Sequence, residues 1–199
     1  CNHWLQQREG CDIYAHELTL PVLRQPRLRG PLNVYRQVMW GAPMPSVGQV
    51  VPDRIKTPNH SFKVLHTPGH SPDHIVLFDE DRGWAFTADL FVGGIDRAAR
   101  QDAHGSQLIA SLERLQALSP TRLFPGSGHV RTNPGEELSQ KLDYLRDLRE
   151  RIQALHQAGR SVRAIRRKLF PRPMFMEAIT LADFSAWNLI RAFLKEDRP

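Results

Sequence analysis

The sequence predicts a layered α/β domain followed by a small group of helices, on the basis of three observations. Short apolar runs of strand length recur along the middle of the chain, at 62–65, 75–78, 84–87 and 122–124. An amphipathic helix is predicted at 106–118, where Leu and Ile recur at helical spacing. A long apolar stripe from Leu138 to Leu155 predicts a further helix. Strands that alternate with amphipathic helices are typical of a layered α/β core.

Smaller elements are predicted before this core. A helix is expected at 3–9, ended by Gly10, and a short buried strand at 12–15. Residues 17–49 are rich in Pro and Arg and are interpreted as short helices and loops. We expect their large side chains to pack in the core or to line a cleft, in particular those of Tyr35, Met39 and Trp40.

Three helices are predicted in the C-terminal part of the chain. Asn133 and Pro134 are a plausible cap and first turn of the first helix. Ser161 is expected to cap the second, and the third is predicted at 184–194. We therefore divide the chain into an α/β domain, residues 1–133, and an appended helical subdomain, residues 134–199.

The composition suits one globular domain with a small appendage, since the chain has 199 residues, of which 41% are hydrophobic. No apolar run approaches the ~20 residues that span a bilayer, and no signal-peptide pattern is visible. Two cysteines, Cys1 and Cys11, do not make a disulfide framework. We expect free thiols, a cytoplasmic location and no membrane partner.

The net charge of +6 is concentrated in one stretch of the chain. Between Lys141 and Arg172 stand ten Lys and Arg against three Asp and Glu, a local net charge of +7. Such a stretch is most often a solvated helix face. It can also attract an anionic substrate or nucleic acid.

Four of the nine histidines lie close together, at His60, His66, His70 and His74. Their spacing does not indicate a helical zinc motif, because Pro and Gly at 68, 69 and 72 break any helix there. A His in a loop that follows a strand can offer a ring nitrogen to a metal. A hydrogen-bonded structural role remains the alternative for each of them.

Two further polar residues follow predicted strands. Asp89 comes directly after the run 84–88, and His129 follows 123–124 through the short loop 125–128. A carboxylate in such an apolar setting needs a partner, which is either a metal ion or an Arg. Loops that follow separate strands can gather ligands into a metal cleft.

Three segments carry a resemblance to the metallo-β-lactamase superfamily. Residues 67–74, TPGHSPDH, resemble its Thr-Pro-Gly-His-Thr/Ser-x-x-His segment. Residues 86–91, FTADLF, resemble its following strand, with Ala88 where Gly is usual. Residues 125–129, PGSGH, resemble its Pro-Gly-His-Gly loop, with Val130 where Gly is common. The helical tail looks like the appendage of glyoxalase II-like members and of a related group with endoribonuclease activity.

The resemblance implies an αββα sandwich that holds a site for two metal ions. His70 would be the third ligand of the first metal, and His129 would bind the second. Asp89 would bridge both ions and orient the attacking hydroxide, which makes it the expected catalytic residue. His74 is similar to a family residue that supports the loop, so it is left out of the ligand set with His60 and His66.

One departure from the family pattern affects the ligand set. The His-x-His-x-Asp-His signature, which supplies four of the family's seven ligands, is absent from the chain. We interpret the chain as a fragment whose N-terminal part, with the signature, lies upstream of Cys1. The competing interpretation is a degenerate, metal-free paralogue. With three ligands of seven, the 199-residue chain alone is expected to bind metal weakly and to hydrolyse little.

The resemblance predicts a hydrolase with two zinc ions, although His and Asp also accept iron or manganese. The expected reaction is hydrolysis of a thioester or other acyl ester on a small molecule by a metal-bound hydroxide. The alternatives are a phosphodiesterase or ribonuclease, which the basic stretch favours, and a non-catalytic binding domain. The substrate and the oligomeric state are not predicted.

Overall fold

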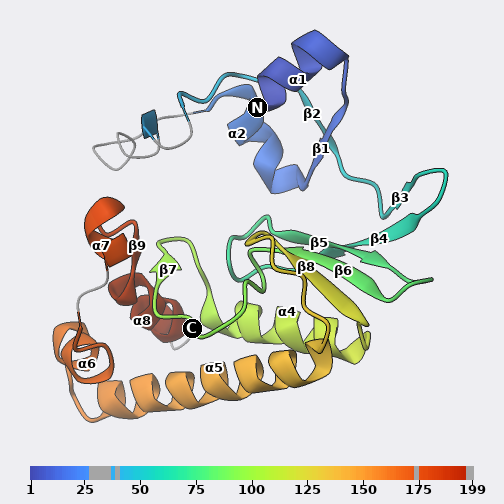
Figure 1. The fold of residues 1–199 in the computed structure, drawn as a ribbon. Coiled ribbons are helices and arrows are strands. Elements are labelled where there is room, and N and C mark those ends of the chain that lie inside the picture. The colour runs from blue at the N-terminus through green and yellow to red at the C-terminus, as the bar shows by residue number, and fades with distance from the viewer. Residues whose placement is uncertain (27–36, 39–40, 173–174, 196–199) are drawn as a thin grey trace.

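The computed structural model describes residues 1–26, 37–38, 41–172 and 175–195. Its centre is a five-stranded sheet in the order β3-β4-β5-β6-β8 (Figure 1). The strands are β3 Arg54–Lys56, β4 Ser61–His66, β5 Ile75–Asp79, β6 Trp84–Ala88 and β8 Arg122–Pro125. Neighbours are antiparallel except β6 and β8, which run parallel and are connected through α4, Gly105–Ala117. The four predicted strands and the helix between them are confirmed, and β3 is an addition.

One face of this sheet packs against α4 and α5, Pro134–Gln157 (Figure 1). Val76, Ala85 and Leu123 of the sheet are fully buried there, because alternate side chains of a strand point to the same face. The apolar residues of α4 that recur at helical spacing face them and are also buried, namely Ile109, Leu112 and Leu115. The fold is therefore the layered α/β arrangement that the sequence predicts.

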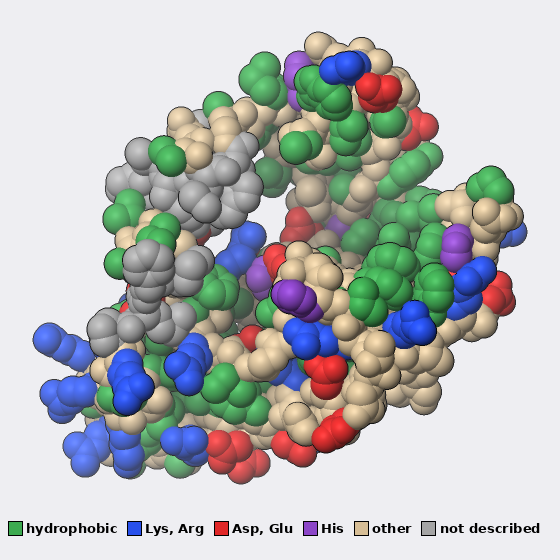
Figure 2. Space-filling model, viewed as in Figure 1, with side chains coloured by type: hydrophobic (Ala, Val, Ile, Leu, Met, Phe, Trp, Pro, Cys, Tyr) green, Lys and Arg blue, Asp and Glu red, His purple; other side chains and the backbone are tan. Residues whose placement is uncertain are grey.

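The opposite face of the sheet carries a row of aromatic rings. Phe62 of β4 meets Phe86 of β6 edge-on at 5.6 Å, and Phe86 stacks on Phe124 of β8 at 4.7 Å between ring centroids. Figure 2 shows hydrophobic side chains gathered over this part of the sheet. The sheet is thus apolar on both faces, which is typical of a sheet inside a layered fold.

The C-terminal part contains α5, α6 Val162–Leu169, α7 Phe175–Ile179, β9 Phe184–Ser185 and α8 Ala186–Leu194. β9 pairs with β7, Ala99–Arg100, which ties the tail back to the α/β part. Buried residues of the sheet, α4, α5, α6 and α8 form one continuous hydrophobic cluster. The division at residues 133 and 134 therefore stays a prediction. No helix in the described ranges has the length and apolarity needed to cross a membrane.

One predicted helix start and one predicted side-chain cap need correction. The third helix begins at Ala186 and not at 184, because 184–185 form β9 and Ser185 caps the helix by accepting the N–H of Asn188. The start of α5 at Pro134 is confirmed, with Asn133 at the N-cap position, but the side chain of Asn133 donates to Glu136 and accepts no N–H group of the helix. The predicted cap of α6 is confirmed, because Ser161 Oγ accepts the N–H of Ala164 at 3.3 Å.

The N-terminal segment stands apart from the main sheet (Figure 1). It contains α1 Asn2–Glu9, β1 Ile13–Ala15, a 3-10 turn at Glu17–Thr19, α2 Leu20–Arg24 and β2 Gly48–Val50. The helix that ends at Gly10, with φ +64°, is confirmed. The strand expected at 12–15 is present as β1, but the expectation that it is buried is wrong, because within the described residues it pairs with β2 alone and Tyr14 remains 46% exposed. Both cysteines are free and exposed, whereas Tyr35, Met39 and Trp40 lie outside the described residues.

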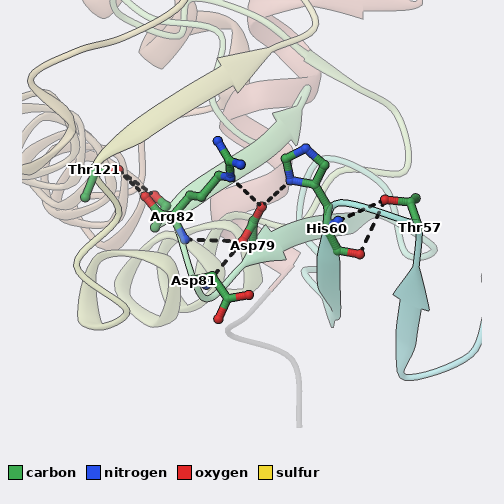
Figure 3. Close-up of polar contacts among 7 residues, drawn as sticks. Thr57, His60, Asp79, Asp81, Arg82 and Thr121 are labelled. Carbon is green, nitrogen blue, oxygen red and sulfur yellow. Dashed lines mark hydrogen bonds and ion pairs between the residues drawn. The ribbon is translucent and has the colours of Figure 1, made fainter.

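The β5–β6 hairpin is fixed by a buried carboxylate (Figure 3). Asp79, which is 1% exposed, accepts the backbone N–H groups of Asp81 and Arg82 and contacts His60 Nδ1 at 2.7 Å. Thr121 donates to the carbonyl of Arg82 and so joins the start of β8 to the same turn. His60 therefore lies at the opposite end of β5 from His70.

The Asp79 contacts predict a pH-dependent stability. The hydrogen bond from His60, with those from the turn N–H groups, lowers the pKa of Asp79. Folding thus favours the ionised form of Asp79. The contribution of this carboxylate to the stability of the fold is present above pH 3.8 and is lost as the pH falls through the lowered pKa. Asp79→Asn should lower the melting temperature by about 2–4 °C at pH 7, and less at pH 3. Circular dichroism melts at both pH values measure this. Asp81→Asn, in the same turn, is the control and should melt like the wild type.

Candidate functional site

Three loops that carry predicted site residues leave the main sheet at the same edge. β4, β6 and β8 all run in the same direction, because β4 and β6 are each antiparallel to β5, and β8 is parallel to β6. The loops after these strands contain His70, Asp89 and His129 respectively. The topology therefore places all three residues at one end of the sheet.

The structure brings His70 and Asp89 together. His70 Nε2 lies 3.6 Å from Asp89 Oδ2, and the two side chains are 23% and 58% exposed. Both line a pocket of about 200 Å³, whose apolar lining includes Leu90, Leu108 and Leu189. Burial lowers the pKa of His70, although the nearby Asp89 carboxylate acts in the opposite direction. An imidazole whose neutral form is favoured by burial thus faces a solvent-accessible carboxylate in a partly apolar pocket.

His129 lies on a loop that packs against Asp89 but is not shown to join the pair. Gly126 N donates to the carbonyl of Ala88 at 2.9 Å, and a Cβ on Gly126 would come within 2.9 Å of Asp89 Oδ1. His129, three residues further along, is exposed. Across the described ranges, no three His, Cys, Asp or Glu residues are grouped closely enough to hold a metal ion.

The loop before His70 is docked on α4. A Cβ on Gly69, at φ +136°, would lie 2.3 Å from the backbone of Leu108, so only Gly allows this close approach. His104 N donates to the Gly69 carbonyl at 2.8 Å, and Ser111 Oγ donates to that of Pro68 at 2.7 Å. These contacts fix the position of His70 relative to the helix.

His74 supports the same loop from inside. It is 9% exposed, and its Nδ1 lies 2.8 Å from Thr67 Oγ1, while its Nε2 is buried with no partner among the described atoms. Burial first, and then the neighbouring His70, lower the pKa of His74 to about 4. His66 is bound to the Pro72 carbonyl instead. The interpretation of His74 as a loop support agrees with its bond to Thr67.

Asp73 is a positioning residue of this loop that the sequence did not identify. Its carboxylate accepts hydrogen bonds from Ser71 Oγ at 2.7 Å and from Thr19 Oγ1 at 2.6 Å. The second bond spans 54 positions and joins the N-terminal segment to the loop that presents His70. A contact between such distant residues leaves no local signal in the sequence.

The residue before Asp89 is held in a strained conformation. Ala88 has φ +43°, in the left-handed region that costs roughly 1–2 kcal/mol for a residue with a Cβ. Ala88 is exposed, so its methyl group adds little to packing. The usual Gly at this position of the resembled family fits the geometry found here.

Ala88→Gly should therefore stabilise the chain by about 0.5–1 kcal/mol, because relief of the strain exceeds the added freedom of the unfolded chain. Ala85→Gly is the matched control in the same strand. Ala85 is fully buried, and its replacement should cost about 1 kcal/mol or more. Urea unfolding of the three proteins measures both effects. A destabilised Ala88→Gly would contradict the assignment of strain.

Residues 93–97, called the 93–97 loop below, adjoin the pocket through Asp96, and α5 holds them in place. Lys141 is only 2% exposed, and its Nζ contacts Asp96 Oδ1 at 2.8 Å and the Gly94 carbonyl at 3.0 Å. Tyr144 Oη donates to the carbonyl of Asp96. Lys141 is thus not part of a solvated basic face. Its place on the apolar stripe, between Leu138 and Leu145, was the signal for its burial.

Comparison with known proteins finds sequence similarity to one family over the first part of the chain. The family profile described as Metallo-beta-lactamase superfamily matches residues 1–129. "Hydroxyacylglutathione hydrolase GloC" of Haemophilus influenzae is 35% identical over 91 residues, which are 41% of this chain and 40% of that protein. "Atrochrysone carboxyl ACP thioesterase nsrC" of Aspergillus novofumigatus is 30% identical over 128 residues, 59% of this chain and 39% of that protein.

A solved structure extends the comparison to the helical tail. The metallo-beta-lactamase family protein TTHA1429 from Thermus thermophilus superposes with a TM-score of 0.67 at 17% identity. The superposition covers 95% of this chain and 68% of that one, so the fold of both the sheet and the C-terminal helices is shared. The chain spans well under two thirds of the length of the hydroxyacylglutathione hydrolase and of the ACP thioesterase that it matches.

Proposed function

Because the chain belongs to the metallo-beta-lactamase superfamily, a family of metal-dependent hydrolases, we propose that the whole protein hydrolyses a thioester or related acyl ester of a small molecule. The observation that carries the proposal is the pair of His70 and Asp89, 3.6 Å apart in a pocket with an apolar lining. The names of the two relatives, a hydroxyacylglutathione hydrolase and an ACP thioesterase, support an acyl substrate.

The imidazole of His70 and the carboxylate of Asp89 are ligand types that a divalent metal accepts. Burial lowers the pKa of His70 and so favours the neutral ring, which is the form that binds metals. Asp89 adds an accessible carboxylate, and His129, on the adjoining loop, is proposed as the third ligand. We propose two zinc ions for the whole protein, although the same donors accept iron or manganese. Such ions lower the pKa of a water molecule to about 7 and polarise an acyl oxygen.

The side chains of this chain would position the reactants. The carboxylate of Asp89 can accept a hydrogen bond from the attacking water and orient it, which is the catalytic role proposed for it. Leu90, Leu108 and Leu189 would hold the acyl group and exclude bulk water, as in other pockets with few polar groups. Docking of the Gly69 segment on α4 keeps His70 at a fixed position relative to this apolar lining.

A substrate panel on the metal-loaded whole protein tests the proposal. The panel contains an acylated glutathione, an acyl-coenzyme A, an oxygen ester of the same acyl group and bis-p-nitrophenyl phosphate. We expect thiol release from at least one thioester, and much slower hydrolysis of the phosphodiester. Preferred turnover of the phosphodiester would refute thioester hydrolysis. Absence of both activities together with absence of metal binding would support a non-catalytic domain.

A ribonuclease is the second candidate, because basic side chains gather over α6 and the end of α5 (Figure 2). Arg163, Arg167 and Lys168 are exposed there. Arg166 is different, since it pairs with Glu177 at 3.0 Å with both side chains largely buried. RNA binding that weakens with salt, and that is lost when these three exposed residues become Gln, would favour this candidate. Arg166 should be left intact in this test, because it is paired with Glu177.

The cytoplasmic location remains a prediction from the sequence.

A further inference from the structure

A second pocket, of about 340 Å³, lies at the junction of the 93–97 loop, α5 and the end of α6. Its volume is within the range of small-molecule sites. The apolar part of the lining comes from these three elements, and consists of Ile95, Tyr144, Leu148, Leu169, Phe170 and Pro171. The remaining lining residues are Arg97, Arg151 and Arg172. The pocket thus combines an apolar floor with three cationic groups.

This pocket shares the 93–97 loop with the pocket of His70 and Asp89. Asp96 lines the first pocket, and the residues on either side of it, Ile95 and Arg97, line the second. Lys141 and Tyr144 of α5 hold this loop by donating hydrogen bonds to its backbone carbonyl groups. A ligand bound in the second pocket could therefore extend over one short loop to reach the first.

The charge balance of the second pocket favours an anion, because no acidic residue is among the described residues that line it. Arg151 has an ion pair with Asp147 at 3.1 Å, but both side chains are more than half exposed, so the pair is weak and can exchange. The carboxylate of Asp96 is already neutralised by Lys141. Tyr144 stays neutral at pH 7, since burial raises its pKa to about 12.

We propose that this pocket binds the phosphate-bearing part of a thiol carrier, the phosphopantetheine group that coenzyme A and acyl carrier proteins share. Guanidinium groups pair with phosphate oxygens in a bidentate manner, and the apolar floor would hold the aliphatic part of the carrier. The acyl thioester would then cross the 93–97 loop to His70 and Asp89. This inference rests on the proposed thioester hydrolysis and specifies the leaving thiol.

The test measures binding to the 199-residue chain by titration calorimetry and needs no catalysis. The ligands are coenzyme A, phosphopantetheine, pantetheine without phosphate, and glutathione. We expect both phosphorylated ligands to bind at least about 10-fold more tightly than pantetheine and glutathione, the effect of one charge-assisted contact. The double variant Arg97→Gln with Arg151→Gln should lose affinity by a similar factor. Arg163→Gln is the control, since it removes an exposed arginine of α6 outside the pocket.

The outcomes separate the pocket from the proposed reaction. Equal binding of coenzyme A and phosphopantetheine supports recognition of the shared phosphate, and tighter coenzyme A binding supports a free coenzyme A ester. Binding of pantetheine or glutathione as tight as that of coenzyme A overturns the inference, as does no binding or unchanged affinity in a folded double variant. Phosphate-dependent binding without thioester hydrolysis by the whole protein would refute the reaction and leave the anion site standing.

Discussion

Asp89→Asn should lower the thioester hydrolysis rate of the metal-loaded whole protein by about 10²–10³-fold, the usual cost of removing a group that stabilises or orients the reacting atoms. The amide keeps the shape of the side chain but lacks the charge that faces His70 at 3.6 Å. The loss should appear in kcat/KM measured by thiol release. His70→Ala should give a loss of similar size, because it removes the other member of the pair.

The control for this pair of variants is Asp143→Asn, which changes an exposed carboxylate of α5 to the same amide. It should keep the wild-type rate. Asp89 is itself more than half exposed, so its replacement should leave the circular dichroism spectrum and melting temperature nearly unchanged. A fully active Asp89→Asn protein would remove Asp89 from the reaction.

Lys141→Met should destabilise the chain by about 2–3 kcal/mol, because breaking a buried ion pair leaves one charge without its partner. Asp96 is 23% exposed, so water can partly replace the lost ammonium. Asp96→Asn should cost more, about 3–4 kcal/mol, since it leaves the charge of Lys141 buried. Urea unfolding of the single variants and the double variant measures these values and their coupling.

Arg146→Met serves as the matched control for Lys141→Met. Arg146 pairs with Glu113 at 2.6 Å, but both side chains are more than 40% exposed, so the change should cost less than about 1 kcal/mol. If Lys141→Met were equally mild, the ion pair would not hold the 93–97 loop. A double variant that costs the full sum of the single changes would show that Lys141 and Asp96 act independently.

The sequence predicts the elements whose signals are local. The apolar run of β5 and the helical spacing in α4 and α5 identify elements that become buried, as Val76 and Leu112 illustrate. Ser161 caps α6 because the capping side chain and the N–H that it accepts are only three residues apart. His70 and Asp89 could be proposed as neighbours because each follows a strand that ends at the same edge of the sheet.

Features that depend on distant contacts could not be predicted. Lys141 was counted in the basic stretch, but it is buried and forms an ion pair with Asp96. Because these two residues are far apart in the chain, no local pattern indicates the pair. Arg166, also counted in the basic stretch, forms an ion pair with Glu177 of α7 and is therefore not part of a solvated basic face. Strand β1 carries the apolar pattern of a buried strand, but its burial depends on which elements cover it, and Tyr14 remains exposed.

The metal content of the whole protein tests the proposed site most directly. The protein is purified after equilibration with zinc, iron or manganese and measured by plasma mass spectrometry, beside the variants His70→Ala and Asp89→Asn. We expect two ions per wild-type chain, and in each folded variant the loss of at least one of them. Equal metal content in all three proteins, or none in the wild type, would contradict a metal site at His70 and Asp89.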